Sequence, residues 1–283
     1  MHIGISMSCL DHDRHTRSEA RDLALKLREQ FDLSSVEIIL EGIGRRFAPY
    51  PWEYEEAELR ELEDFVNHFQ CKGAHLPFYN LNVIAVNERV REDAMEQIRL
   101  AIEIAKRLKL DYAVIHATGS TEGVATDREP RRQFLAFSRC AAFCEGSGLT
   151  LSIENATNLH DIKSCAKMIR RLKDEGLPVA MTFDTGHANI PRASQDVPVP
   201  VKQFGAMADA IESCFDIIDN IHLHNNHGSY DQHLGLLDGS IDLKSCLKRL
   251  RSLNYQGSIS LEVNSQVKDI TSELATLKEW CTA

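Results

Sequence analysis

The sequence predicts a single (β/α)8 TIM barrel that spans residues 1–283, and three observations support this fold class. Short runs rich in β-branched residues alternate with long amphipathic runs from end to end, which is typical of βα units around a parallel sheet. Eight such units follow one another without a long linker, which favours a closed barrel over an open doubly wound sheet. No G-x-G-x-x-G string follows the first strand, so a dinucleotide-binding fold has little support.

Each strand is expected where a short apolar run is bounded by turn-forming or polar residues. The expected strands are 2–6 (HIGIS), 35–40 (SVEIIL), 72–76 (KGAHL), 112–116 (YAVIH), 150–154 (TLSIE), 178–184 (PVAMTFD), 220–224 (NIHLH) and 258–262 (SISLE). Helical patterns lie between them, and the clearest runs from about Asn87 to Lys109. Its apolar residues recur at helix spacing at Val90, Ala94, Ile98, Ala101, Ile102 and Ala105. The Pro-rich stretch from Pro191 to Gln203 is expected to form a long loop over the barrel mouth.

Composition narrows the class of protein further. With 43% hydrophobic and 26% charged residues, the chain can bury a large core without disulfides. Its net charge of −10 argues against a nucleic-acid partner, although bound divalent metals would offset part of that charge. Its eight cysteines are scattered without a C-x-x-C pair, so buried, reduced thiols are expected. No apolar run is long enough for a membrane helix and no signal peptide is recognised, so we expect a cytoplasmic protein.

Residues of metal-binding type gather where the expected strands end. In a barrel of this kind the loops that follow the strands converge at one face, and the chemistry occurs there. A lone His or Glu at a strand end is more often structural than a ligand, but a ring of acidic residues around the barrel axis is costly unless cations lie among them. The nine candidate ligands are His75, His116, Glu154, Asp184, His187, His222, Asp231, His233 and Glu262.

The types of ligand limit the choice of metal. Carboxylates and imidazoles without thiolates suit Zn, Mn, Co or Mg and do not select sharply among them. The additional histidines favour zinc or another transition metal. The set leaves room for one to three divalent ions.

Several strings, in order and over nearly the whole chain, carry a resemblance to a known family: GAHLPFYNLN, VIHATGS, SIENATN, TFDTGHANI, HLHNNHG followed by DQHLGLLDGSID, and SLEVN. They resemble the xylose isomerase-like TIM barrel superfamily, which contains sugar and sugar-phosphate isomerases and epimerases, related dehydratases, and apurinic/apyrimidinic (AP) endonucleases of the endonuclease IV type. The resemblance implies a core metal site, as in the sugar epimerases, formed by Glu154, Asp184, His222 and Glu262. In the endonuclease branch the other five candidates complete a trinuclear zinc cluster.

The sequence departs from the endonuclease branch in several strings. ENATN replaces an ENTAGQG-like string, DTGH replaces DTCH, and HLHNN replaces HLND. The DTGH and HLGLLDGSID segments instead resemble isomerase-like members, although Asp238 stands where glycine or glutamate is typical. On the seventh strand we choose His222 as the ligand and His224 as a second-layer residue. We expect His227 to be an exposed loop residue.

The resemblance favours a metal-dependent sugar or sugar-phosphate isomerase or epimerase of carbohydrate metabolism. Glu154 and Glu262 would remove and return a proton next to a carbonyl through a metal-stabilised enediolate, and His187 would orient a substrate hydroxyl or bind a second metal. The alternative is an AP endonuclease that hydrolyses phosphodiesters with a trinuclear zinc cluster. A dehydratase or lyase, or a barrel that only binds a ligand, is also open. A homo-oligomer would fit the family.

Three residues near the second strand are candidates for substrate binding. Arg45 and Arg46 could hold a substrate phosphate or carboxylate, although paired loop arginines are more often surface charge. Trp52 could form an apolar wall for a sugar ring, although ordinary core packing is the safer expectation. Glu41 lies near the same rim.

Overall fold

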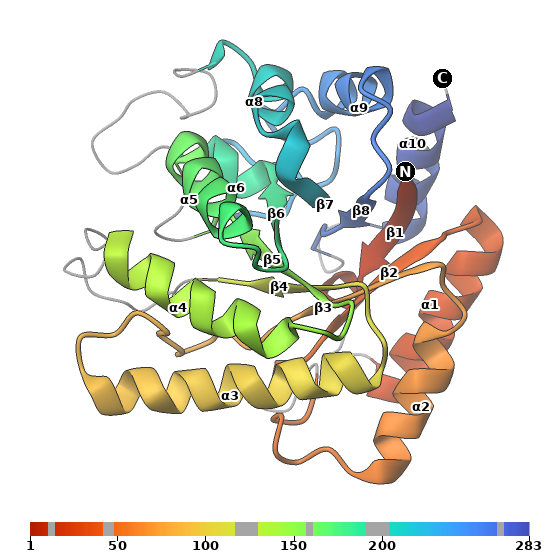
Figure 1. Cartoon of the computed structure of the whole chain (residues 1–283). Coiled ribbons are helices and arrows are strands. Elements are labelled where there is room, and N and C mark those ends of the chain that lie inside the picture. Colours follow the sequence, from red (N-terminus) through yellow and green to blue (C-terminus); the bar gives the residue numbers. More distant parts are fainter. Residues whose placement is uncertain are drawn as a thin grey trace.

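Eight parallel strands close into a barrel in chain order, β1 to β8, in a computed structural model of the chain (Figure 1). The structure describes residues 1–10, 15–41, 48–116, 130–156, 161–190, 204–264 and 269–282. The barrel closes where β1 pairs with β8, with His2 opposite Ser258 and Ile5 opposite Leu261. The strands are β1 (His2–Ser6), β2 (Ser35–Ile39), β3 (Cys71–His75), β4 (Tyr112–Ile115), β5 (Thr150–Glu154), β6 (Val179–Asp184), β7 (Ile218–Leu223) and β8 (Ser258–Leu261).

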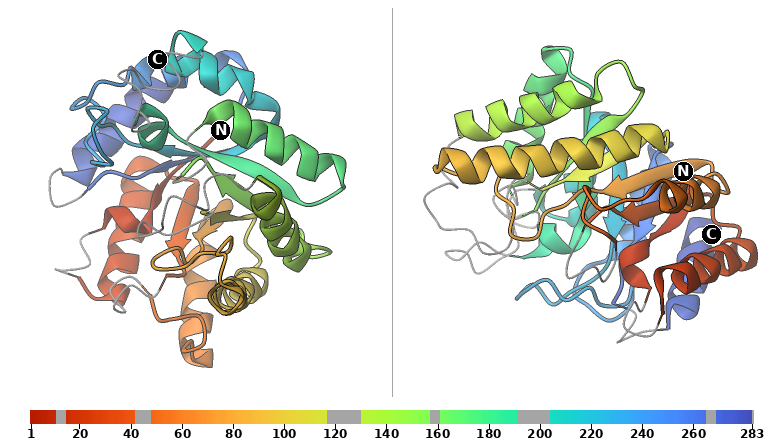
Figure 2. Two further views of the ribbon diagram at one scale, coloured as in Figure 1. Left: turned by 90° about the vertical axis from the view of Figure 1, so that its left-hand side faces the viewer. Right: turned by 90° about the horizontal axis from the view of Figure 1, so that it is seen from below.

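Helices surround the strands on all sides, as the two further views show (Figure 2). The principal helices are α1 (Arg17–Phe31), α2 (Glu56–Val66), α3 (Glu88–Arg107), α4 (Pro130–Cys144), α5 (Ile162–Asp174), α9 (Leu243–Ser252) and α10 (Ile270–Thr282). Shorter helical turns are η1 (Met7–Cys9), α6 (Thr185–Asn189), α8 (Met207–Ser213) and η4 (Phe215–Ile217).

Polar side chains fix where the long helices begin. Thr16 and Glu19 form a reciprocal capping box at the start of α1, and Asn87 accepts a hydrogen bond from the backbone N–H of Arg89 at the start of α3. Asp161 and Asp242 cap α5 and α9 in the same way. These caps satisfy N–H groups that have no partner inside the helix.

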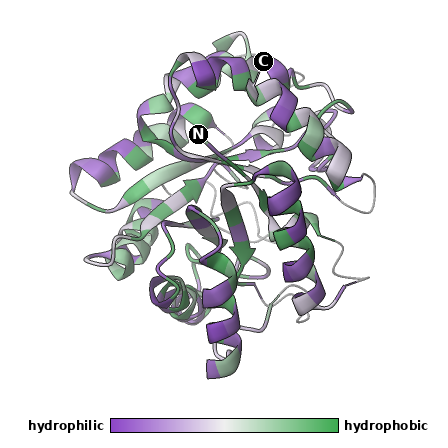
Figure 3. Ribbon diagram, turned by 90° about the vertical axis from the view of Figure 1, so that its right-hand side faces the viewer, coloured by the Kyte–Doolittle hydropathy of each residue, from purple (hydrophilic) through white to green (hydrophobic). Residues whose placement is uncertain are grey.

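The core lies between the barrel and the helical layer. The strands are buried almost throughout, because helices cover their outer face and side chains fill the interior. Hydrophobic residues follow the strands, whereas hydrophilic residues mark the outer faces of the helices (Figure 3). All eight cysteines are free and six are buried, as expected. None of the helices in the described ranges combines the length and apolar character that a membrane span requires.

The predicted fold class is confirmed, and the strands lie within two residues of their expected bounds. The helix expected from about Asn87 to Lys109 is α3, which ends at Arg107. Val90 differs from the expectation, since it is exposed near the start of α3 instead of joining the buried stripe. The Pro-rich stretch 191–203, together with Arg45 and Arg46, lies outside the described residues.

Candidate metal centre

The nine candidate ligands lie together at the carboxyl ends of the strands. His75 ends β3 and Glu154 ends β5. Asp184 ends β6, and Glu262 directly follows β8. His116, directly after β4, and His222, in β7, join them. The remaining three reach the same face from the segments after β6 and β7.

Hydrogen bonds hold the end of β6 in place. Asn155 accepts a hydrogen bond from the backbone N–H of Asp184 at 2.7 Å and donates to its carbonyl oxygen at 2.9 Å. The Asp184 carboxylate in turn accepts the backbone N–H of His187 at 2.6 Å, which starts the short helix α6. This turn sends the His187 ring back towards Glu154.

The loop after β7 folds back against the barrel mouth. Asn225 and Leu234 form an antiparallel bridge through two backbone hydrogen bonds of 3.1 and 2.8 Å. Within this loop His233 adopts a left-handed φ of 47°. Its Nδ1–H donates to the backbone carbonyl of Glu262 at 2.6 Å, which leaves Nε2 facing Asp231 at 2.9 Å. The backbone thereby selects the nitrogen that faces the site.

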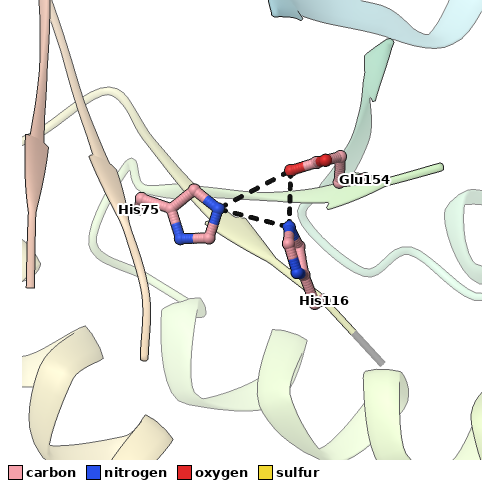
Figure 4. Close-up of side chains that lie close together, drawn as sticks. All are labelled: His75, His116 and Glu154. Atoms are coloured by element: carbon pink, nitrogen blue, oxygen red, sulfur yellow. Dashed lines mark hydrogen bonds and ion pairs between the residues drawn. The ribbon is translucent and has the colours of Figure 1, made fainter. Parts of the chain in front are cut away.

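The first cluster consists of His75, His116 and Glu154 (Figure 4). The Nε2 atoms of the two histidines are 3.2 Å apart, and they lie 3.6 and 2.8 Å from Oε2 of Glu154. The Nδ1–H of His75 donates to the carbonyl of Leu76 at 2.9 Å, so its Nε2 is directed towards the cluster. Two imidazole nitrogens and a carboxylate oxygen are the donor types that zinc prefers.

The second cluster centres on Nδ1 of His222, a buried atom without a hydrogen-bond partner among the described residues. Oxygens of Glu154 and Glu262 lie 3.4 Å from it, and an oxygen of Asp184 lies 3.8 Å away. These separations are longer than the roughly 2.7–3.2 Å of ordinary N–H···O hydrogen bonds. Ligands held about 2.0–2.2 Å from a tetrahedral metal ion are themselves roughly 3.3–3.6 Å apart, so the distances from His222 to Glu154 and Glu262 match a shared metal ion, and the Asp184 oxygen lies slightly farther away.

The third cluster is formed by His187, Asp231 and His233. Oδ2 of Asp231 lies 3.2 Å from Nε2 of His187 and 2.9 Å from Nε2 of His233. The other ring nitrogen of His187 lies 2.7 Å from Oε1 of Glu154. The His187 ring therefore connects the third cluster to the carboxylate shared by the first two.

The carboxylates and imidazoles strongly perturb one another. Burial alone would raise the pKa of Glu154, but the charges of His116 and His222 and hydrogen bonds from imidazoles hold it well below its ordinary value. Burial alone would lower the pKa of His75, but the Glu154 carboxylate raises it to about 9. Burial would likewise lower the pKa of His233, but the hydrogen bond to Asp231 raises it to about 9. A metal ion bound to these imidazoles must displace protons.

Glu37 is part of this site and was not among the sequence candidates. It lies fully buried within β2, and its Oε2 accepts a hydrogen bond from Nε2 of His222 at 3.0 Å and another from Asn220 at 3.1 Å. This contact leaves Nδ1 of His222 to face the three carboxylates. Glu37 thus contacts the opposite nitrogen and supports the ligand from behind. The sequence signal that could have identified Glu37 is a charged residue inside an otherwise apolar strand.

His224 contacts the site through Asp184. Its Nε2 lies 3.1 and 3.2 Å from the two carboxylate oxygens, and its ring stacks on that of His233 with centroids 3.9 Å apart. The ring occupies space left by Gly186, where a Cβ atom would lie only 1.9 Å from the His224 ring. The glycine of DTGH therefore makes room for the second histidine of HLHNN.

The other candidates lie apart from the three clusters. His227 is exposed, as expected. Trp52 is 55% exposed, so the safer expectation of core packing is wrong. Its ring stacks on Tyr50 with centroids 4.9 Å apart.

Replacing Glu37 tests its support of His222. We expect Glu37→Gln to weaken binding of the core metal by about 10–100-fold, because the imidazole loses a charged hydrogen-bond partner. Competition with a fluorescent chelator measures this affinity. Asp219→Asn is the matched control, since Asp219 lies on the same strand as His222, towards its amino end, and should leave the affinity unchanged. Equal affinities in both variants would contradict the role of Glu37.

Replacing Gly186 tests the packing of His224. Gly186→Ala should displace the His224 ring, lower metal content and reduce the melting temperature, because overpacking a buried site costs roughly 1–3 kcal/mol. Calorimetry and metal analysis are the measurements. In the double variant Gly186→Ala/His224→Ala the clash is absent, so the alanine at 186 should add almost nothing to the effect of His224→Ala. If the losses of stability and metal content from the two substitutions are additive, the effect of Gly186→Ala does not come from a clash with His224.

Comparisons with known proteins agree with this architecture. The sequence model of the family described as "Xylose isomerase-like TIM barrel" matches residues 26–280. A protein of Methanocaldococcus jannaschii, MJ1311, is 29% identical over 216 residues, which cover 73% of this chain and 68% of that protein.

Two solved structures are similar over the whole of this chain. A D-tagatose 3-epimerase-like protein has a TM-score of 0.77 at 23% identity, with 97% of its own chain covered. The protein TTHB071 from Thermus thermophilus, soaked with ZnCl2, has a TM-score of 0.70 at 20% identity, with 98% covered. The chain belongs to the xylose isomerase-like TIM barrel family.

Proposed function

We propose that the protein is a metal-dependent sugar or sugar-phosphate isomerase or epimerase. The observation that carries this proposal is the buried Nδ1 of His222, which faces carboxylates of Glu154, Asp184 and Glu262 at the barrel mouth. Family membership and the similarity to an epimerase-like structure support it.

Glu154, Asp184, His222 and Glu262 would hold the core metal. The ion, when bound, supplies Lewis-acid polarisation of the substrate's adjacent oxygens. Zn, Mn, Co and Mg all suit this donor set, and the imidazoles of the neighbouring clusters favour zinc or another transition metal.

The protein's own carboxylates then move the proton. Both oxygens of Glu154 lie against imidazoles, with His116 at 2.8 Å and His187 at 2.7 Å. Glu262 is less constrained, since Ser8 Oγ lies 3.5 Å from it and His222 lies 3.4 Å away. We therefore assign Glu262 as the base that takes the proton next to the carbonyl, and Glu154 as the group that returns it on the opposite side. His187 orients a substrate hydroxyl.

Deuterium incorporation tests this assignment. Incubation with the correct sugar in D2O should place deuterium on the carbon next to the carbonyl. Glu262→Gln should slow this exchange by about 10²–10⁴-fold, because the amide cannot accept the proton. Mass spectrometry of a panel of ketoses, aldoses and their phosphates measures it.

Metal content provides the control. Glu262→Gln should retain most of the metal, since the amide oxygen is still a ligand. Glu154→Gln should lose both metal and exchange, because Glu154 is shared by the first two clusters and contacts His187 of the third at 2.7 Å. Absence of exchange in the wild-type protein with every sugar of the panel would refute the proposal. Product analysis then separates an isomerase or epimerase from a dehydratase, whose first step is the same.

The grouping of nine ligand-type residues into three clusters favours a second candidate, a trinuclear AP endonuclease. Two or more metals can activate water and neutralise the leaving oxygen of a phosphodiester. About three zinc ions per chain, together with cleavage of an abasic duplex at low salt, would support this function. About one metal ion per chain, without cleavage of the abasic duplex, would leave the isomerase or epimerase as the supported function.

A further inference from the structure

We propose that a cavity beside the metal centre binds a second, uncharged sugar ring, so that the substrate is a neutral glycoside or oligosaccharide. The proposal rests on the proposed function for what happens at the metal, but the cavity can be tested separately. The cavity has a volume of about 590 Å³, within the usual range of small-molecule sites.

Two loops and one helix form its walls. The segment before α2 contributes Tyr50 and Trp52, and the segment after β3 contributes Tyr79 and Asn80. The amino-terminal half of α3, which lies along the lower edge in Figure 1, completes the wall.

An aromatic surface lines one side of the cavity. The rings of Tyr50 and Trp52 are stacked with an interplanar angle of 0°, so Tyr50 supports one face of the Trp52 ring. Trp52 is 55% exposed and Tyr79 is 48% exposed. Adjacent exposed aromatic side chains are typical of a binding site, because their apolar faces gain by burial against a ligand. The C–H face of a sugar ring suits such a surface.

Hydrogen-bonding groups lie around this surface. Glu41 is 3% exposed and accepts a hydrogen bond from the backbone N–H of Tyr79 at 2.7 Å. Asn80, Asp93 and Gln97 add further polar groups to the lining. Carboxylates and amides accept hydrogen bonds from hydroxyl groups, and the amides can also donate.

The charge of the lining favours a neutral ligand. Its described residues include two acidic side chains, Glu41 and Asp93, which would repel a phosphate. An organic cation would gain from two full negative charges. Burial, however, raises the pKa of Glu41 to about 7, against the opposing effect of His75, so its charge is incomplete at neutral pH. A hydroxyl-rich neutral ring fits this wall better than either ion.

The cavity and the metal centre share a wall. His75, the last residue of β3, belongs to the first cluster, and Tyr79 lies four residues further along the same segment. The backbone N–H of Leu40 donates to the carbonyl of His75 at 2.9 Å, which ties the segment carrying Glu41 to that histidine. We infer that a ligand with two linked rings contacts Trp52 with one ring and extends towards the metal with the other.

Fluorescence of Trp52 tests the proposal directly. The chain has two tryptophans, so Trp280→Phe leaves Trp52 as the single reporter. We expect cellobiose or maltose to change its emission saturably, and glucose 6-phosphate and choline to have little effect. In calorimetric titrations, Trp52→Ala should weaken disaccharide binding by about tenfold, as expected for loss of one aromatic contact. Leu135→Ala, which removes a similarly exposed apolar side chain from α4, should leave binding unchanged.

The outcomes separate this inference from the proposed function. Disaccharide binding at Trp52 without deuterium exchange in any sugar would support the cavity and refute the isomerase. A second outcome is deuterium exchange with monosaccharides that persists in Trp52→Ala, while no disaccharide binds up to its solubility limit. This outcome would refute the sugar-binding role of the cavity and leave the isomerase proposal standing. Saturable binding of choline instead of the disaccharides would overturn the neutral-sugar assignment.

Discussion

The structure depends on how one buried carboxylate, that of Glu154, is compensated. Its side chain is almost inaccessible to solvent, and a lone charge buried in this way would be very costly. Imidazoles approach it from different elements, with His116 at 2.8 Å, His187 at 2.7 Å and His222 at 3.4 Å. The parallel strands β4, β5 and β7 end at one face of the barrel, so these groups meet there. The strand order of the sheet and the assembly of the site are therefore linked.

A polar network inside the barrel supports this arrangement from below. Asn220 donates to Glu37 at 3.1 Å, and its oxygen accepts a hydrogen bond from Ser258 at 2.6 Å. Glu37 in turn holds the ring of His222. Asn220, Ser258 and Oε2 of Glu37 thereby gain partners, which favours keeping such groups inside a core, whereas Oε1 of Glu37 and Nδ1 of His222 have no hydrogen-bond partner among the described residues. The small polar residues of β7 and β8 thus act on the metal centre although they do not reach it.

Much of the fold and the centre could be predicted from the sequence. Apolar runs marked the strands, and most of the nine ligand-type residues could be singled out because they occur at or just after strand ends, whereas Asp231 and His233 lie in the loop after β7. Glu37 could not be found in this way, since it lies within β2 and its role depends on a contact across the barrel. The packing of His224 against Gly186 joins residues from two different βα units, which no local pattern reports. The exposure of Trp52 depends on loop shape, the least predictable property of a single sequence.

Protons and metal ions are alternative ways to balance the same buried charge. Burial disfavours the charged imidazole, yet the surrounding carboxylates raise the pKa of His75, His187, His222 and His233 above the ordinary value. Protonated imidazoles can therefore compensate the carboxylates when no metal is bound. Each imidazole that becomes a ligand must release its proton. The additional histidines thus serve two states of the protein, and this explains how so many acidic groups can converge at one barrel mouth.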